Sequence, residues 1–323
     1  MAEFTPEVLF IGGGVVDIPL RPVDRYIFDV GSYPLDSIRM EIGGDAVNES
    51  IIASRLGCRT ALISKFGRDA AGDFICAALV ENGVNTDWVV REDGLDTGIN
   101  IVLVRENGER SFLTNRNGSL RKLGPADILP ALDSPAVSRA KIVSLASIFV
   151  SPLLTPENTA QLFSQIKAKG ITLCADMTRP KNGERSADVR DLLSHLDYFF
   201  PNREEAEQLT GEHDLDAIAD DLLDKGVKNV VIKIGAQGSF LKNTAFRAIV
   251  PAYRGAKCVD TTGAGDNFAA AFITALLDGR PFEDCARFAN AAASICVEHV
   301  GATVGVRSRE AVDARYRELC AQG

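Results

Sequence analysis

A glycine-rich segment near the C-terminal end combines an anion-binding backbone with a carboxylate. Residues 260–272 read DTTGAGDNFAAAF, and Gly263, Ala264 and Gly265 stand at the start of a run with helical periodicity. Backbone N–H groups that converge at a helix N-terminus bind anions, because the helix dipole favours negative charge there. Asp266 follows at once and could accept the proton of an attacking hydroxyl. This pattern predicts phosphoryl transfer, although a tight turn with an N-cap would look the same.

A second glycine-rich helix start lies near the N-terminal end of the chain. Residues 43–67 read GGDAVNESIIASRLGCRTALISKFG, so Gly43 and Gly44 stand shortly before Asn48. The glycines leave space for a polyol against the backbone, and an asparagine amide can both donate to and accept from hydroxyls. Because Gly-Gly and Asn also cap ordinary helices, this segment alone leaves both interpretations open.

Short runs rich in β-branched residues alternate with segments of helical period along most of the chain. The expected strands are residues 8–12, 60–67, 141–146, 171–177, 197–202 and 229–235. The expected helices between them are residues 46–56, 73–83, 156–170 and 216–226. Such alternation predicts an α/β fold with a mostly parallel sheet that is covered by helices on both faces.

Two segments, 18–42 and 97–117, interrupt this alternation and read as strands without a helix between them. The second contains the turn ENGE between two apolar runs and should form a hairpin. We expect the two insertions to pair into a small sheet that lies as a lid over the carboxyl ends of the main strands, where α/β folds bind ligands. The chain would then be a single kinase-like domain over residues 1–323, and an apolar outer face of the lid predicts a homodimer through the lid.

Composition narrows the class of protein. The net charge of −9 and a pI near 5.0 disfavour nucleic acids or an acidic membrane surface as partners. The seven cysteines form no CxxC pair and the three histidines show no ligand spacing, which argues against a zinc site or a histidine triad. No apolar stretch is long enough to span a membrane and no signal peptide is recognisable, so we expect a cytoplasmic protein.

Taken together, the two glycine-rich segments resemble the signatures of the ribokinase-like, or PfkB-type, carbohydrate kinases. The first signature is matched by Gly43, Gly44, Ala46, Asn48, Ser50, Gly57 and Gly67, and the second is matched without a gap over residues 260–272. The resemblance covers nearly the whole chain. It implies a ribokinase-like, Rossmann-like fold and an ATP-dependent kinase of a sugar or sugar acid, as in ribokinases, fructokinases and 2-keto-3-deoxygluconate kinases.

The resemblance also implies roles for individual residues. Asp266 would be the general base, with Gly263, Ala264 and Gly265 as the anion hole. The implied sugar ligands are Asp17, Gly43, Gly44 and Asn48. The residues implied near ATP are Asn202, Lys233, Gly235, Gly238, Gly263, Gly265 and Asn290, the last beside adenine. Asn202 and Glu205 would hold Mg²⁺ through water. The implied site for K⁺ or another monovalent cation consists of Asp260, Thr262, Cys296, Gly301 and Gly305.

Departures from the family pattern leave the substrate open. The chain reads Asp176-Met-Thr-Arg-Pro where many fructokinases read DPNxR, so Thr178 replaces the asparagine and Arg179 is shifted. Asp45 stands where ribokinases often carry lysine. Three polar residues in or beside the expected lid could contact the substrate and determine specificity: Asn100, Arg110 and Arg116.

Two alternatives remain at this point. A nucleoside or pseudouridine-type kinase would need an aromatic platform, which Tyr26, Phe28 and Tyr33 could supply, whereas a sugar acid would call for an arginine. A catalytically silent sugar-binding regulator is the other alternative, and the intact set of Asp266, Asn202 and Glu205 argues against it.

Overall fold

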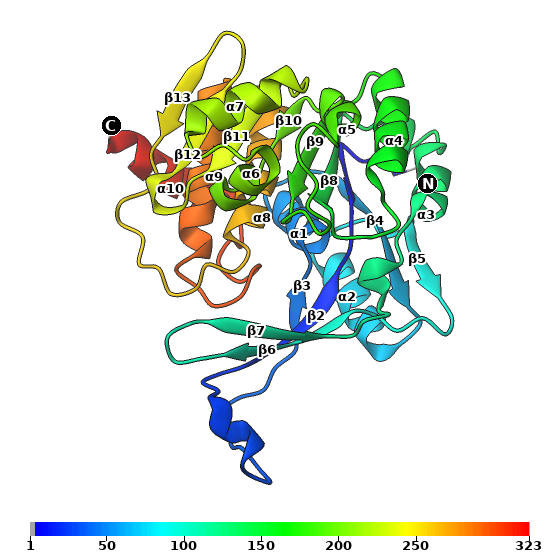
Figure 1. The fold of residues 1–323 in the computed structure, drawn as a ribbon, viewed down its shortest axis with the longest axis vertical. Coiled ribbons are helices and arrows are strands. Elements are labelled where there is room, and N and C mark those ends of the chain that lie inside the picture. The colour runs from blue at the N-terminus through cyan, green and yellow to red at the C-terminus, as the bar shows by residue number, and fades with distance from the viewer. Residues whose placement is uncertain (1–3, 323) are drawn as a thin grey trace.

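The computed structural model describes residues 4–322, and its centre is a nine-stranded sheet in the order β13-β12-β11-β10-β9-β8-β1-β4-β5 (Figure 1). The strands are β1 (Val8–Ile11), β4 (Thr60–Gly67), β5 (Val89–Glu92), β8 (Ile142–Ile148), β9 (Thr172–Met177), β10 (Tyr198–Phe199), β11 (Asn229–Lys233), β12 (Ser239–Lys242) and β13 (Arg247–Val250). All neighbouring strands are parallel except at one edge, where β12 pairs antiparallel with both β11 and β13.

Helices cover both faces of this sheet and enclose two apolar cores. One face packs against α1 (Asp45–Arg55), α2 (Ala70–Glu81), α8 (Ala264–Leu277), α9 (Phe282–Cys296) and α10 (Arg309–Ala321). The other face packs against α3 (Pro125–Leu132), α4 (Pro156–Ala168), α5 (Arg190–Ser194), α6 (Arg203–Thr210) and α7 (Leu215–Asp224). Successive residues of β1 point into different cores, as the alternation of side chains along a strand requires. The predicted α/β class is confirmed.

A small sheet of four strands lies beneath the large one (Figure 1). Its order is β3-β2-β6-β7, with β2 (Val15–Leu20), β3 (Glu41–Gly43), β6 (Ile99–Val104) and β7 (Arg110–Thr114). β2 follows the carboxyl end of β1 after three glycines, pairs parallel with β6, and β6 forms an antiparallel hairpin with β7. The structure confirms the predicted hairpin and the predicted pairing of the two insertions.

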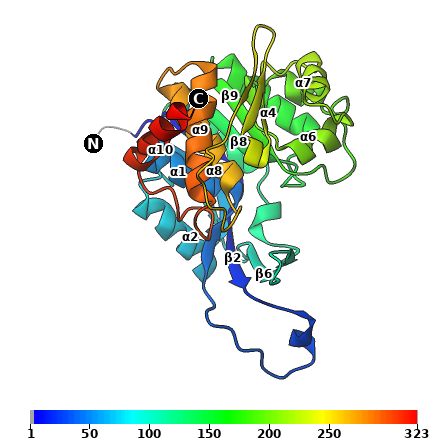
Figure 2. The same cartoon turned by 90° about the vertical axis from the view of Figure 1, so that its left-hand side faces the viewer.

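The first insertion differs from the expectation. Only its ends form strands, whereas residues 21–40 form an arm that projects from the body and contains one short 3₁₀ helix, Arg25–Phe28 (Figures 1 and 2). Pro22, Pro34 and Gly31 interrupt this stretch, and proline lacks the N–H group that a sheet ladder needs. The expectation of continuous strands over residues 18–42 was therefore wrong.

The structure also contains three strands, β5, β12 and β13, and three helices, α3, α5 and α6, that the sequence did not predict, and the other differences are short. The strand expected over residues 197–202 covers only Tyr198–Phe199, because Pro201 follows and Asn202 already caps α6. Three further 3₁₀ helices lie at Ser119–Arg121, Val137–Arg139 and Gly235–Gln237. Within residues 4–322, none of the helices has both the length and the apolar character that crossing a membrane requires.

Candidate active site

Two helix N-termini meet at the centre of the site. α8 starts directly behind Gly263, whose φ of +73° lies in the left-handed region that favours glycine, and it carries Asp266 in its first turn. α1 starts behind Gly44 and carries Asn48 in its first turn. The two helices pack together, and Nδ2 of Asn48 donates to Oδ2 of Asp266 over 2.7 Å. The structure thus joins the two predicted glycine-rich segments at their functional side chains.

The surroundings of Asp266 suit a general base. Burial raises the pKa of the Asp266 carboxyl to about 6; the bond from Asn48 lowers it and the charge of Asp176 raises it. A carboxylate with that pKa is ionised at neutral pH and still accepts a proton readily. Oδ1 of Asn48 is buried and has no partner among the described residues, although buried acceptors normally have one. A substrate hydroxyl that donates to this oxygen would complete the arrangement.

The predicted anion hole lies in the same first turn. The N–H groups of Gly265 and Asp266 belong to the turn that has no intrahelical acceptors. The N–H of Ala264 donates instead to the carbonyl of Thr261 over 3.2 Å, so this amide is already used. A Cβ atom at Gly265 would lie 3.1 Å from Nζ of Lys233, which places an ammonium group directly beside the anion hole.

Asp176 belongs to the site although the sequence reasoning assigned it no role. It is the penultimate residue of β9, is buried, and its Oδ2 accepts from Nζ of Lys233 over 2.5 Å. Burial alone would lower the pKa of Lys233, but the charges of Asp176, Glu205 and Asp266 outweigh this and raise it. An aspartate at the carboxyl end of a buried parallel strand is a signal that could have revealed this residue.

Two acidic side chains of α1, Asp45 and Glu49, lie close to this cluster of carboxylates. Burial, together with the charges of Asp266 and Asp176, raises the pKa of Asp45 and of Glu49 well above the ordinary range. Glu49 is completely buried, and its Oε2 accepts from Oγ of Ser144 over 3.3 Å, whereas its Oε1 has no partner among the described residues. The site therefore suits ligands that bring hydroxyl donors or a cation.

The small sheet supplies a second group of polar residues. Asp17 on β2 stands opposite Asn100 on β6, and Nδ2 of Asn100 donates to Oδ1 of Asp17 over 2.8 Å. Burial raises the pKa of Asp17, while the bond from Asn100 lowers it. A Cβ atom at Gly43 would lie 2.1 Å from Oδ2 of Asp17, so the side chain of Asp17 occupies this space. The structure brings these three predicted sugar ligands together.

The three arginines that the sequence singled out have different surroundings. Arg110 reaches from the start of β7 to Asp260, to which its Nη2 donates. Arg116 is exposed in the loop after β7. Arg179 pairs with Glu204 over 2.5 Å, and both side chains are exposed. A role of Arg110 or Arg116 in substrate recognition stays a prediction.

The predicted Mg²⁺ residues form the start of α6. Oδ1 of Asn202 accepts from the N–H of Glu205, and Oε2 of Glu205 accepts from the N–H of Asn202, each over 2.9 Å. Burial raises the pKa of Glu205 to about 7; Lys233 lowers it and Asp176 raises it. Within residues 4–322, no three His, Cys, Asp or Glu side chains could hold a metal ion directly. This donor set fits Mg²⁺ held through water, because Mg²⁺ keeps several waters and prefers oxygen.

The predicted nucleotide loop lies at the antiparallel edge of the large sheet. Gly235 and Gly238 flank the turn between β11 and β12, and Gly238 has a φ of +104°. A Cβ atom at Gly238 would lie 2.0 Å from the carbonyl oxygen of Val250. Asn290 is buried and donates to the carbonyls of Val250 and Pro251 over 3.0 and 3.1 Å. Asn290 thus fixes this edge, and its predicted position beside adenine stays a prediction.

The residues of the predicted monovalent-cation site are also neighbours. The N–H and Oγ1 of Thr262 donate to Oδ1 of Asp260 over 3.0 and 2.7 Å, and the N–H of Gly301 donates to Oδ2 over 3.1 Å. Sγ of Cys296 donates to the carbonyl of Thr262 over 3.3 Å. A Cβ atom at Gly305 would lie 3.1 Å from Cα of Cys296. Whether this group binds a cation stays a prediction.

Comparison with known proteins agrees with this geometry. Residues 7–309 match the pfkB family of carbohydrate kinases. The chain is 32% identical to a ribokinase of Arabidopsis thaliana, over 95% of this chain and 80% of that protein. It is 29% identical to a 2-dehydro-3-deoxygluconokinase of Bacillus subtilis, over 87% of this chain and 88% of that protein.

A solved structure shows the same fold. The structure of Arabidopsis thaliana ribokinase complexed with ribose and ATP superposes with a TM-score of 0.81 at 27% sequence identity. The match covers 97% of this chain and 99% of that one. The chain therefore belongs to the pfkB family of carbohydrate kinases, and it is a phosphotransferase that acts on a sugar hydroxyl.

Proposed function

We propose that Asp266 is the general base that activates the sugar hydroxyl for attack on the γ-phosphorus of ATP. The observation that carries this proposal is the meeting of Asn48 and Asp266 at two helix N-termini, one of which also carries the anion hole. The relative whose structure contains ribose and ATP supports the two ligand classes. The acceptor is a sugar or a sugar acid.

Each group of residues would have its own role in the phosphoryl transfer. Asp17 and Asn100 hold hydroxyls of the sugar, and Oδ1 of Asn48 accepts from another. The attacking oxygen forms its bond to the γ-phosphorus while the bond from that phosphorus to the bridging oxygen of ADP breaks, and the hydroxyl proton passes to Asp266. The N–H groups of Gly265 and Asp266 stabilise the charge on the moving phosphoryl oxygens.

We further propose that Asn202 and Glu205 position Mg²⁺ through water. When bound, Mg²⁺ would neutralise charge on the β- and γ-phosphate oxygens. Lys233, with its raised pKa, stays protonated and stands beside the anion hole, where it contributes a further positive charge. Gly235 and Gly238 leave the backbone of the nucleotide loop open to the phosphates, and Asn290 supports that loop from α9.

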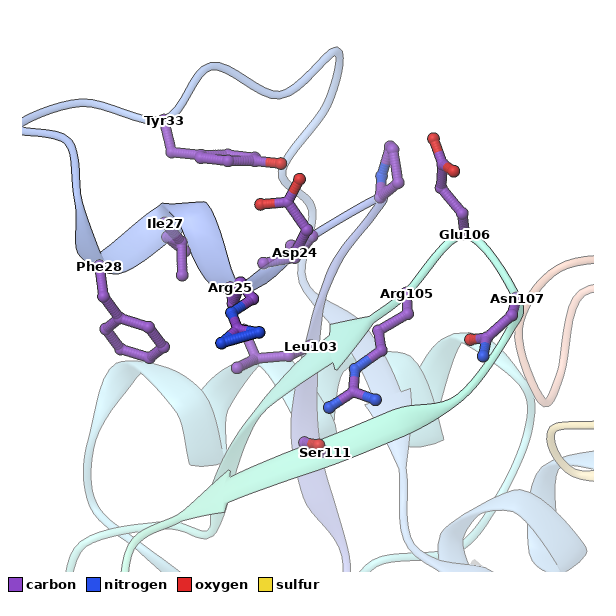
Figure 3. A pocket seen from close by; sticks show the side chains of 12 residues that line it. Asp24, Arg25, Ile27, Phe28, Tyr33, Leu103, Arg105, Glu106, Asn107 and Ser111 are labelled. Atoms are coloured by element: carbon purple, nitrogen blue, oxygen red, sulfur yellow. The ribbon is translucent and has the colours of Figure 1, made fainter.

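The aromatic residues argue for a sugar rather than a nucleoside. Phe28 and Tyr33 line a hollow of about 890 Å³ between the arm and the hairpin, together with Leu103 (Figure 3). Leu103 lies an odd number of positions from Asn100 along β6, so its side chain points to the opposite face of the small sheet. The hollow is therefore on the face away from Asp17 and Asn100, where it supplies no platform for a base.

An ATP-coupled screen tests this function. Pentoses, hexoses, sugar acids and nucleosides are offered one at a time, and ADP release is recorded for the native chain and for Asp266→Asn. A sugar or sugar acid that releases ADP with the native chain alone supports the proposal. ADP release with nucleosides only, or equal release by both proteins, would contradict it.

We propose that residues 1–323 act as one kinase domain and that the small sheet moves as its lid. β2 follows the end of β1, and β3 leads into the glycines before Asn48, so a movement of the small sheet would change the position of Asp17 and Asn100 relative to Asn48. Hydrogen exchange of residues 97–117 with and without sugar checks this, and unchanged exchange would argue against a lid.

We also propose a homodimer that forms through the outer face of the small sheet. β7 is an edge strand, and Leu113, which faces outward beside Ile101, is 57% exposed. The arm adds Tyr26 and Phe28, which are 56% and 84% exposed. A free edge beside an apolar face is a surface that another copy can cover.

For the location we propose the cytoplasm. The seven cysteines are free thiols, four of them buried. Free thiols persist where the compartment is reducing. Thiol alkylation in intact cells followed by mass spectrometry checks this, because disulfide-linked cysteines would escape the reagent.

A further inference from the structure

Arg110 connects the small sheet to the loop that leads into the anion hole. It begins β7, and its Nη2 donates to Oδ1 of Asp260, a residue 150 positions away. In the register of the hairpin, Arg110 lies on the same face as Asn100, because Asn100 pairs with Thr114, four positions after Arg110. One face of the hairpin thus carries both a predicted sugar ligand and this contact.

Asp260 organises the two loops that surround the anion hole. Its Oδ1 accepts from the N–H and the hydroxyl of Thr262, and its Oδ2 accepts from the N–H of Gly301. Gly263 follows, and a Cβ atom there would lie 2.4 Å from Cβ of Ala302, so the two loops are in direct contact. The guanidinium of Arg110, which the small sheet holds against Asp260, therefore acts on the backbone that leads to Gly265 and Asp266.

The carboxylate of Asp260, the charged member of the expected monovalent-cation site, already has four protein donors, one of them the guanidinium of Arg110. The carbonyl of Thr262, another expected ligand, accepts from Sγ of Cys296, and the neighbouring carbonyl of Ala302 accepts from Nδ2 of Asn267 over 2.7 Å. Asn267 also donates to the carbonyl of Gly263 over 2.7 Å, so it turns its amide nitrogen toward this group. Because the carboxylate of Asp260 is already paired with a guanidinium, the charge that would hold a metal cation is already neutralised, and this donor set does not fit one.

We propose that the guanidinium of Arg110 is the built-in cation of this site, so that closure of the small sheet, and not K⁺, sets the geometry of the anion hole. This inference rests on the proposed function, because it assigns Arg110 as a positioning residue for the phosphoryl transfer at Asp266. Arg110 touches no reacting atom. It acts through Asp260, Thr262 and the start of α8.

The first test compares Arg110→Met and Arg110→Lys with the native chain, in buffers whose monovalent cation is either K⁺ or tetramethylammonium. The native rate should be the same in both buffers. Arg110→Met should lose roughly 10²-fold in kcat with a smaller change in the KM for ATP, because positioning is lost, and Arg110→Lys should recover part of it. Arg105→Met is the control, since Arg105 lies on the same hairpin and pairs with the exposed Glu109.

Two measurements need no turnover and separate this inference from the proposed function. Hydrogen exchange of residues 260–265 should be faster in Arg110→Met than in the native chain without any ligand. K⁺ should raise the unfolding temperature of Arg110→Met more than that of the native chain, because removal of the guanidinium frees Asp260. A native rate that requires K⁺, or unchanged exchange in Arg110→Met, would overturn the inference. Absent kinase activity with faster exchange would instead count against the proposed function alone.

Discussion

The side-chain amide of Asn48 donates to the carboxylate of Asp266 over 2.7 Å, although the two residues are 218 positions apart. This bond joins the first turn of α1 to the first turn of α8 and lowers the pKa of Asp266, against the burial that raises it. The proposed sugar side and the proposed phosphate side of the site thereby share one contact.

Removing the amide of Asn48 should move the acid limb of the pH profile. For the native chain, kcat/KM should fall below about pH 6, because protonated Asp266 cannot accept the hydroxyl proton. In Asn48→Ala the bond that lowers the pKa of Asp266 is lost, so the limb should move upward by about one pH unit. Ser50→Ala is the control, since its hydroxyl bonds only within α1 to Val47. An unshifted limb in Asn48→Ala would contradict this relationship.

Replacing Glu205 should weaken the response to Mg²⁺. A glutamine side chain at this position could still accept from the N–H of Asn202, so Glu205→Gln should keep the start of α6 while it removes the charge. The Mg²⁺ concentration for half-maximal rate should rise by about tenfold, as expected for a group that acts through water. Glu204→Gln, at the neighbouring exposed position, should titrate like the native chain. Identical titrations for Glu205→Gln and the native chain would remove Glu205 from the metal site.

Glu49 should make the free energy of unfolding depend on pH. Its pKa in the folded chain lies above the ordinary value of 4.5, so the folded state keeps a proton that the unfolded state releases as the pH rises. Stability contributed by this proton is present at low pH and is lost as the pH rises through the folded-state pKa.

Glu49→Gln should therefore lose less stability than the native chain between about pH 5 and pH 8, with a difference on the order of 1 kcal/mol at the upper end. Chemical denaturation at both pH values measures this difference. Glu81→Gln, at the exposed end of α2, serves as the control. Parallel pH dependences of Glu49→Gln and the native chain would show that Glu49 does not carry the effect.

The outer face of the small sheet predicts the oligomeric state. Leu113→Lys places a charge on the exposed apolar surface beside Ile101 and should convert the dimer to a monomer, because a buried unpaired charge is costly. Light scattering at micromolar concentration measures the mass. Ile249→Lys, at an exposed position on β13, should stay dimeric. A native chain that is monomeric in this measurement would contradict the proposed dimer.

Much of this site could be predicted from sequence because its parts are local. Gly263, Gly265 and Asp266 occupy one helix turn, and Gly44 and Asn48 occupy another, so their spacing alone indicates their geometry. Six of the nine strands of the large sheet were predicted for the same reason, since strand and helix periods are properties of short segments.

What could not be predicted depends on contacts between distant segments. The place of Asp176 at the end of a buried strand is a local signal, but its pairing with Lys233 and the place of Glu49 beside Asp266 depend on how β9 and α1 pack. The contact between Arg110 and Asp260 likewise depends on how the hairpin lies against the body. The arm over residues 21–40 was mistaken for strands, because its apolar residues suggest a sheet while its prolines prevent one.

The most direct test of the account is the turnover of Asp266→Asn with ATP and its sugar. The kcat should fall by at least about 10³-fold, because the general base and the position it fixes are both lost, while the Kd for ATP stays close to that of the native chain. Asp278→Asn, at the other end of α8, should keep the native kcat. If Asp266→Asn kept about a tenth of the native kcat or more, Asp266 would not be the general base.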